Sequence, residues 1–392
     1  MVKSIYMDNQ AGAPVEPRVF EAMKPHFLDI WGNPSSTHSY GQQSREAVEK
    51  SRETVARFIG AERSNEVVFT SGGTESNNLA LIGFAQRNKD KGNHILVSSI
   101  EHISILNICK YLTKLGFAVT YLPVDKTGLV DPQSVREELT DKTILVSVMV
   151  ANGEIGTIEP IREIGEIVKE KNVAFHTDAV AAVGKIPFDV KTEKIDMASL
   201  SSNDMYGPKG VGAVYIKSGT RISPITLGGG QERGLRSGSE NVPGIVGMAK
   251  AAEIASKEMQ SLSARLQGMR EQLRRGILDS VPRAYLNGHP AQRLPDNLNV
   301  RFSYIEGESL VLSLDMEGIS VSSGSACSSK TLEPSHVLLA LGLSHEEAHG
   351  SLLFSLGREN TDEDVNRVLE VVPGIVQRLR KMSPLTPKDL VL

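Results

Sequence analysis

Residues 70–78 (TSGGTESNN) combine glycines and hydroxyl side chains between an expected strand and an expected helix. Backbone N–H groups at such a helix start can bind a phosphate group. The segment has neither the lysine of a P-loop nor the G-x-G-x-x-G spacing of a dinucleotide-binding fold, so neither of those sites is indicated. From these residues alone, a phosphate site and a plain strand-to-helix turn stay equally open.

Asp178 and Cys327 are two further side chains that could do chemistry. Asp178 lies near the end of the strand-like run VAFHTDAV, and a carboxylate at the carboxyl end of a strand in an α/β sheet faces the usual ligand crevice. It could pair with a ring nitrogen there, although capping of the following segment is the favoured interpretation. Cys327 stands among small polar residues (SSGSACSSK), which indicates an exposed, reactive thiol, whereas Cys109 in ISILNICKYL is expected in the core.

The elements that would position these residues follow an α/β pattern. Short β-branched runs alternate with amphipathic stretches between residues 66 and 217, which predicts a mostly parallel sheet covered on both faces. The expected strands begin at Glu66, His94, Val119, Thr143, Val173 and Val211. Helices are expected at 76–90, 103–115 and 161–172, and a long one at 251–278 leads into an α+β region. In that region Ser344 and Glu347 have capping-box spacing, which predicts a late helix.

Charge and composition exclude several classes of protein. The 392 residues carry 43 Lys and Arg against 47 Asp and Glu, a net charge of −4, which argues against a nucleic-acid or anionic-membrane binder. The apolar run at 143–151 is far shorter than the ~20 residues of a membrane helix. Two cysteines cannot form a disulfide framework, and no secretory signal is visible. A cytoplasmic protein of two or three domains is expected.

Over nearly its whole length the chain resembles the cysteine desulfurases of the NifS/IscS type, which are similar to class-V aminotransferases. The motifs that carry the resemblance are MDNQAGAP at Met7, WGNPSSTHSYG at Trp31, FTSGGTESNNLA at Phe69, SSIEHISIL at Ser98, ANGEIGTIEPI at Ala151, FHTDAV at Phe175, YGPKGVGAVYI at Tyr206, GGGQERGLRSGSENV at Gly228 and SSGSACSSKTLEPSHVL at Ser322.

The resemblance implies a fold-type I, pyridoxal-phosphate-dependent homodimer. Its large domain, residues 15–255, would contain a seven-stranded, mostly parallel sheet. A smaller α+β domain, residues 1–14 with 256–392, would carry the Cys327 loop. Members of the family take sulfur from L-cysteine, leave L-alanine and pass the resulting persulfide on for iron–sulfur assembly. An IscU-like scaffold protein is therefore the implied partner.

The resemblance also assigns roles position by position. Cys327 matches the persulfide-forming cysteine, His102 the histidine stacked on the coenzyme ring, and Asp178 the partner of the pyridinium nitrogen. Asn152 matches the contact to the coenzyme's 3′ oxygen, and Ser239 stands where a threonine of the neighbouring subunit reaches the phosphate. The remaining phosphate-binding positions are Gly73, Thr74, Ser201 and Ser202.

Four positions depart from the family pattern. Asp204 replaces the lysine that forms the Schiff base, and a carboxylate cannot form one. Asn203 replaces a histidine, Ala181 a glutamine, and Leu353 the arginine that holds the substrate carboxylate. Lys209 is no substitute for the missing lysine, because relatives carry it beside the catalytic one. The change of two charge units at Asp204 predicts weak coenzyme binding or none.

These departures lead to competing hypotheses. The main one is a member of the iron–sulfur assembly machinery whose Cys327 carries a persulfide, or ligates a metal ion or 2Fe–2S cluster, for the scaffold. The alternative is a working cysteine desulfurase that holds pyridoxal phosphate non-covalently, with Asp204 or His102 removing the α-proton at a much reduced rate. An aminotransferase would need the same missing lysine, and a purely structural subunit would leave Cys327 without a role.

Overall fold

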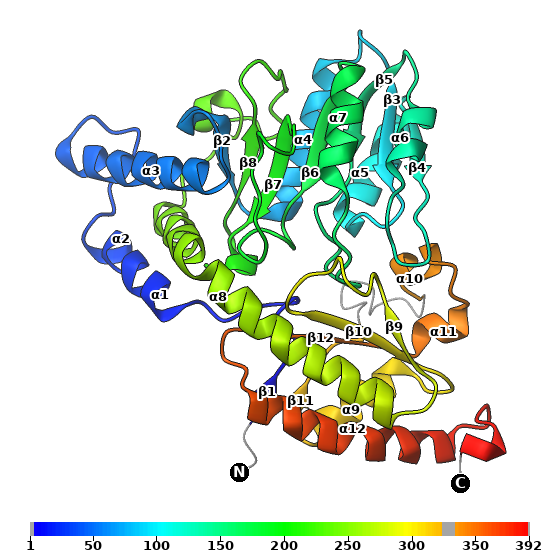
Figure 1. The fold of residues 1–392 in the computed structure, drawn as a ribbon. Coiled ribbons are helices and arrows are strands. Elements are labelled where there is room, and N and C mark those ends of the chain that lie inside the picture. Colours follow the sequence, from blue (N-terminus) through cyan, green and yellow to red (C-terminus); the bar gives the residue numbers. More distant parts are fainter. Residues whose placement is uncertain (1–3, 324–333, 391–392) are drawn as a thin grey trace.

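The computed structural model describes residues 4–323 and 334–390 (Figure 1). Its largest sheet has seven strands in the order β2-β8-β7-β6-β5-β3-β4, and only β8 runs against the others. In that order the strands are Val67–Thr70, Gly212–Ile216, Met197–Ser201, Ala174–Asp178, Thr143–Ser147, His94–Ser98 and Ala118–Leu122. The predicted α/β fold with a seven-stranded, mostly parallel sheet is confirmed.

Side chains alternate between the two faces of this sheet, as the two-residue period of a strand requires. On β3, Ile95 and Val97 join the core beneath α4 (Gly73–Arg87) and α5 (Ile103–Lys114). Leu96 points the other way, into the core covered by α6 (Pro132–Glu138) and α7 (Ile161–Glu170). Helices therefore shield both faces, which explains why these strands read as nearly continuous apolar runs.

One strand of the sheet has no counterpart among the six predicted runs. β7 reads MASLS, without any β-branched residue, so its composition favours no strand. It forms because its neighbours β6 and β8 pair with it on both sides. Expected helix positions were otherwise close, although α4 begins at Gly73 rather than 76 and the long helix α8 spans Val242–Ser280 rather than 251–278.

A second group of strands lies below the carboxyl ends of the large sheet (Figure 1). β9 (Ala284–Asn287), β10 (Asn297–Phe302) and β12 (Ser351–Ser355) form an antiparallel sheet, and β1 (Ile5–Tyr6) pairs with β11 (Ile319–Ser320). Ile5 and Met7 share a core with apolar residues between 266 and 376. The chain's amino end thus packs with its carboxyl part, while the exact boundaries 15–255, and 1–14 with 256–392, stay a prediction.

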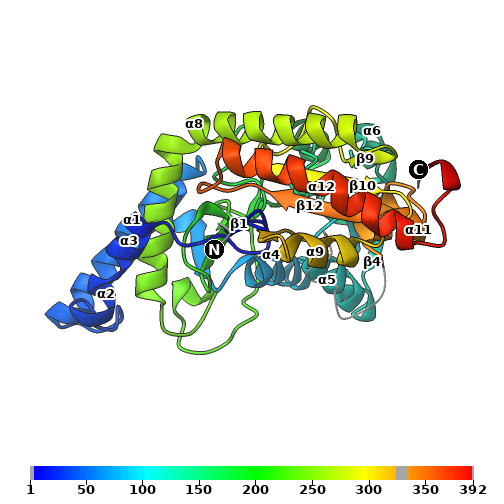
Figure 2. The ribbon, with the colours of Figure 1, turned by 90° about the horizontal axis from the view of Figure 1, so that it is seen from below.

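Helix α8 passes through both cores. Its first half contributes Val242 to Ile254 to the core of the large sheet, and its second half contributes Leu266 to Ile277 to the second core. Figure 2 shows α12 (Asp362–Met382) beneath the second sheet, with the second half of α8 lying alongside it. The capping box predicted at Ser344 and Glu347 is present and opens α11 (His345–His349).

The remaining helices are α1 (Pro17–Met23), α2 (Pro25–Leu28), α3 (Ser39–Phe58), α9 (Gly307–Asp315) and α10 (His336–Ala340). Short 3-10 turns lie at Ser64–Glu66, Asn203–Met205, Glu232–Gly234 and Lys388–Leu390.

A buried ion pair ties α3 to the loop that carries Ser239. Arg52 bonds to both carboxylate oxygens of Glu232 at 2.6 and 2.8 Å, and Glu232 also accepts the N–H of Phe69. Arg52 and Glu232 are both buried, so removal of the arginine would leave an uncompensated charge in the interior. The pair therefore holds this loop against the edge strand β2.

We expect Arg52→Met to lower the free energy of unfolding by about 3–5 kcal/mol, because Glu232 loses the guanidinium that bonds both of its carboxylate oxygens while staying buried. Guanidinium unfolding measures the loss. Glu49, which also contacts Arg52, is exposed, so Glu49→Gln should change stability by less than about 1 kcal/mol. Equal effects of the two substitutions would contradict the assigned role of the buried pair.

Candidate functional site

A cavity of about 520 Å³ opens where the parallel strands of the large sheet end, and we call it the sheet-end cavity. Its walls come from the loops after β2, β3, β5, β6 and β7, from Asp8 and Gln10 near the amino end, and from Leu353 on β12. The carboxyl edge of an open parallel sheet is where ligands bind in such folds. Of the residues singled out in the sequence, those lining it are Gly73, Thr74, His102, Asn152, Asp178, Ala181, Ser201, Asn203 and Leu353.

Asp178 ends β6 with its carboxylate held from two sides. Oδ2 accepts a hydrogen bond from Asn77 Nδ2 at 2.7 Å, and Oδ1 accepts one from the Val180 backbone N–H at 3.0 Å. The bond from Val180 is the local capping interaction that the sequence favoured. The place of Asp178 in the cavity wall is the one expected of a ligand-binding carboxylate. Asp178 thus makes a local bond and also lies in the cavity wall, while its pairing with a ring nitrogen stays a prediction.

His102 is connected to Asp178 through two residues of the neighbouring helices. Its Nδ1 lies 2.7 Å from Ser104 Oγ, and it caps α5 by accepting the Ser104 N–H. Ser104 Oγ accepts in turn from Asn77 Nδ2 at 3.0 Å, and the same amide donates to Asp178. Sequence reasoning missed Asn77 and Ser104, although both stand within the quoted motifs. The network fixes the imidazole and the carboxylate relative to each other.

Asp204 follows Asn203 of the cavity wall in the turn Asn203–Met205 and is buried. Burial raises the pKa of its carboxyl to about 6, and the charges of Asp178 and Asp296 act in the same direction, while Lys185 and the Ser201 hydroxyl oppose it. At neutral pH the group is therefore mostly a carboxylate. The position that matches the Schiff-base lysine of the family thus carries a buried negative charge.

Lys185 is a largely buried lysine whose charge lowers the pKa of Asp204, but its amine already has partners. Nζ lies 2.9 Å from Asp296 Oδ2 and donates to Gln10 Oε1 at 3.1 Å. Burial lowers the pKa of Lys185, but Asp296 and Asp204 outweigh it and the net pKa is raised. Lys209 donates to the Ala13 carbonyl. Lys185 is thus protonated and ion-paired, and the amine of Lys209 is bound to the Ala13 carbonyl, so neither amine is free to act as a nucleophile.

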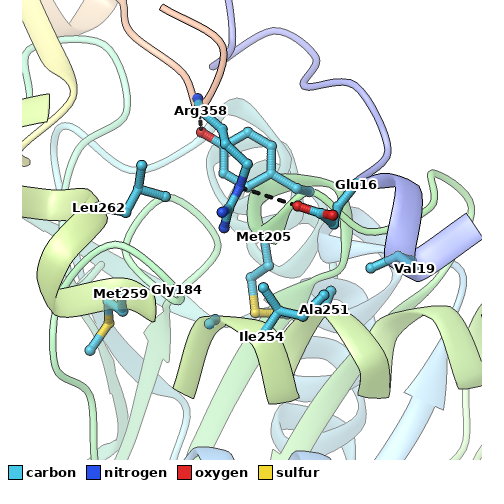
Figure 3. Close-up of a pocket in the computed structure, with 11 residues that line it drawn as sticks. Glu16, Val19, Gly184, Met205, Ala251, Ile254, Met259, Leu262 and Arg358 are labelled. Carbon is cyan, nitrogen blue, oxygen red and sulfur yellow. Dashed lines mark hydrogen bonds and ion pairs between the residues drawn. The ribbon is translucent and has the colours of Figure 1, made fainter. Parts of the chain in front are cut away.

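The turn that carries Asp204 is supported from behind (Figure 3). Tyr206 has a left-handed backbone (φ 61°), and its hydroxyl accepts the N–H of Arg358 at 3.1 Å. Arg358 also pairs with Glu258 at 2.6 Å and with Glu16 at 3.4 Å. The remaining space between Met205 and α8 is about 10 Å³, room for one water at most. This packing holds the turn in place.

The other expected site residues lie elsewhere. Ser202 is buried and follows Ser201 of the cavity wall, and its hydroxyl has no hydrogen-bond partner among the described residues. Ser239 is exposed and does not line the cavity, so its role toward a neighbouring subunit stays a prediction.

Cys327, with its expected thiol and metal-binding roles, lies outside the described residues. Within 4–323 and 334–390, no three His, Cys, Asp or Glu side chains gather as a metal site. Cys109 is in the core as expected, where burial raises its pKa to about 12.

The fold and the cavity define a fold-type I α/β protein with its ligand site at the carboxyl edge of the sheet. The model of the class-V aminotransferase family matches residues 5–368. The chain belongs to this family, in its group of NifS/IscS-type cysteine desulfurases. Among the described helices, none has the length and apolar character needed to cross a membrane.

Several curated relatives and solved structures are similar over nearly the whole chain. The chain is 58% identical to cysteine desulfurase IscS 1 of Archaeoglobus fulgidus, covering 97% of this chain and 99% of the relative. It is 56% identical to cysteine desulfurase IscS of Methanosarcina thermophila, covering 99% and 95%. A solved NifS-like protein has 39% identity and a TM-score of 0.90, covering 96% of this chain and all of that one.

Pyridoxal phosphate is the coenzyme expected for this family, and most of the donor set fits it. Asp178 suits a protonated ring nitrogen, and His102 lies in the same wall. Thr74, Ser201 and the start of α4 offer hydroxyl and N–H donors for a phosphate. Ser202 does not line the cavity, and its hydroxyl lies near Gly207, so its expected phosphate contact stays a prediction. Among the described residues that line the cavity there is no lysine, so what they fit is the ring nitrogen and the phosphate of the coenzyme.

Proposed function

We propose that this protein is a cysteine desulfurase that supplies sulfur for iron–sulfur cluster assembly. L-cysteine and the Cys327 thiol would give L-alanine and a Cys327 persulfide, which an IscU-like scaffold would receive. The observation that carries the proposal is 58% and 56% identity to IscS proteins over nearly their whole length. A cytoplasmic homodimer, with Ser239 of each subunit reaching the other's phosphate site, completes the proposal.

The coenzyme, when bound, supplies an electron sink for the amino-acid substrate. Asp178 would hold its ring nitrogen, because this carboxylate stays oriented by Asn77 and the Val180 N–H. His102 would contact the ring, since its imidazole is fixed by Ser104. Asp204, with a pKa of about 6, can accept and hold a proton at its carboxylate next to Asn203 of the cavity wall. Enclosure by the second sheet would limit the access of water.

A second candidate function follows from Asp204 itself. Because Lys185 and Lys209 are engaged, the described part of the cavity offers no amine for covalent attachment of the coenzyme. Cys327 could then act without cysteine turnover, as a carrier of sulfur made elsewhere or as a ligand to a 2Fe–2S cluster shared with the scaffold. This function keeps the thiol and dispenses with the missing lysine.

Alanine formation separates the two candidates. Purified protein with L-cysteine, added pyridoxal phosphate and a reductant should form alanine faster than Cys327→Ala under the same conditions. Alanine formation at the rate of that variant would overturn the desulfurase proposal. Cluster assembly on a scaffold, supplied with sulfide and compared between the wild type and Cys327→Ala, then tests the second function.

A further inference from the structure

Five acceptor oxygens of residues around the sheet-end cavity have no hydrogen-bond partner in the part of the chain that the structure describes. They are Asp8 Oδ1, Asn77 Oδ1, Glu101 Oε2, Glu154 Oε1 and Asn203 Oδ1, and each of these residues lines the cavity. Asn77 and Glu101 are at most 1% exposed. Because buried polar atoms nearly always have partners, so many acceptors in one wall indicate a ligand that brings several N–H donors.

The orientation of Asn77 follows from its neighbours. Its Nδ2 donates to the Asp178 carboxylate and to Ser104 Oγ at 2.7 and 3.0 Å. A flipped amide would place its oxygen against the carboxylate, where the two would repel each other. Oδ1 is therefore the atom left for a ligand, and only a donor can satisfy it.

Glu101 and Glu154 each use one carboxylate oxygen and leave the other. Glu101 Oε1 accepts the Met149 N–H at 2.8 Å, and Glu154 Oε2 accepts the Ser335 hydroxyl at 2.8 Å. Burial raises the pKa of Glu154 to about 8, and burial together with Asp178 raises that of Glu101. A cation placed among these groups would stabilise their ionised forms.

The charges of the wall point the same way. Among the described residues that line the cavity there are four carboxylates, Asp8, Glu101, Glu154 and Asp178, and no lysine or arginine. Leu353, almost fully buried, presents an apolar side chain from β12. An ammonium group that enters would favour the ionised forms of Glu101 and Glu154 and be attracted by them, whereas a carboxylate would meet no lysine or arginine among these described lining residues.

We infer that the sheet-end cavity binds small primary ammonium compounds through the ammonium group and does not need a carboxylate on the ligand, so that aminothiols without a carboxylate, such as cysteamine, are ligands of the site. Only the choice of an aminothiol as the ligand rests on the proposed function. Binding itself requires neither coenzyme nor turnover, so it is tested separately from alanine formation.

Three thiols of similar size separate the contributions of the two charged groups. L-cysteine has both an ammonium and a carboxylate, cysteamine only the ammonium, and 3-mercaptopropionate only the carboxylate. In calorimetric titrations of the coenzyme-free protein under reductant, cysteamine should bind at least as tightly as L-cysteine. 3-Mercaptopropionate should bind at least ~10-fold more weakly than cysteamine, the factor for one charge-assisted hydrogen bond. Equal or tighter binding of 3-mercaptopropionate, or no heat with cysteamine, would overturn the inference.

Two substitutions locate the site. Glu154→Gln keeps an acceptor for Ser335 but removes the carboxyl group that a bound ammonium would ionise, and should weaken cysteamine binding by roughly 5–10-fold. Glu166 is exposed on α7, so Glu166→Gln is the matched control and should leave the affinity unchanged. Leu353→Arg should raise the affinity for 3-mercaptopropionate above that of the wild type. Equal effects of Glu154→Gln and Glu166→Gln would overturn the inference, even if Leu353→Arg fails to fold.

Discussion

Asp204→Lys should convert non-covalent coenzyme binding into covalent attachment. After incubation with pyridoxal phosphate and reduction with borohydride, we expect the mass of the reduced coenzyme on the peptide that contains residue 204. In the wild type the same peptide should stay unlabelled, because a carboxylate cannot condense with an aldehyde. The effect is large because the lysine both anchors the coenzyme and transfers protons.

The electrostatic surroundings favour a reactive amine at position 204. Burial and the nearby Lys185 would lower the pKa of a lysine there, although Asp178 and Asp296 oppose this. Alanine formation from L-cysteine should rise by about 10²–10⁴-fold, the range for a positioned acid–base group. Asp204→Asn is the control, since it removes the charge without adding an amine. Labelling of Lys185 in the wild type would contradict the assignment of that lysine as protonated and paired.

Lys185→Met should produce the largest loss of stability near the site. The substitution leaves Asp296 and Asp204 buried without the cation that lies 2.9 Å from Asp296. Breaking such a pair from one side costs about 3–5 kcal/mol. Guanidinium unfolding should show this decrease. The double variant Lys185→Met/Asp296→Asn should recover part of it, because one of the stranded charges is removed as well.

The loss caused by Lys185→Met should depend on pH. The folded-state pKa of Asp204, about 6, lies above its ordinary value of 3.8, so the folded state holds more protons and its stability falls as pH rises between these values. Without Lys185 that pKa rises further, and the decrease extends above pH 6. The stability difference from the wild type should therefore be larger at pH 8 than at pH 5. A difference of equal size at both values would show that lost packing, rather than charge, is responsible.

Several parts of the fold followed from local patterns. The β-branched runs of β2, β3, β5 and β8 and the capping box of α11 are visible in the sequence because each depends on residues close together in the chain. β7 was not visible, since its small residues become a strand only between β6 and β8. Pairing partners far apart in the sequence decided that element.

The sequence by itself determined the chemistry that each position can perform. An aspartate at 204 excludes covalent attachment of the coenzyme there, a leucine at 353 cannot hold a carboxylate, and the family motifs placed Asp178 and His102 at the site. Those conclusions need only the identity of a side chain.

Only the tertiary structure decided which groups act on one another. It joined His102 to Asp178 through Ser104 and Asn77, engaged Lys185 with Asp296, and gathered unpartnered acceptors from separate loops around one cavity. The physical reason is that the strength of an electrostatic interaction depends on distance and on exclusion from water. Both are set by how the two cores pack, and neither is a property of any single segment.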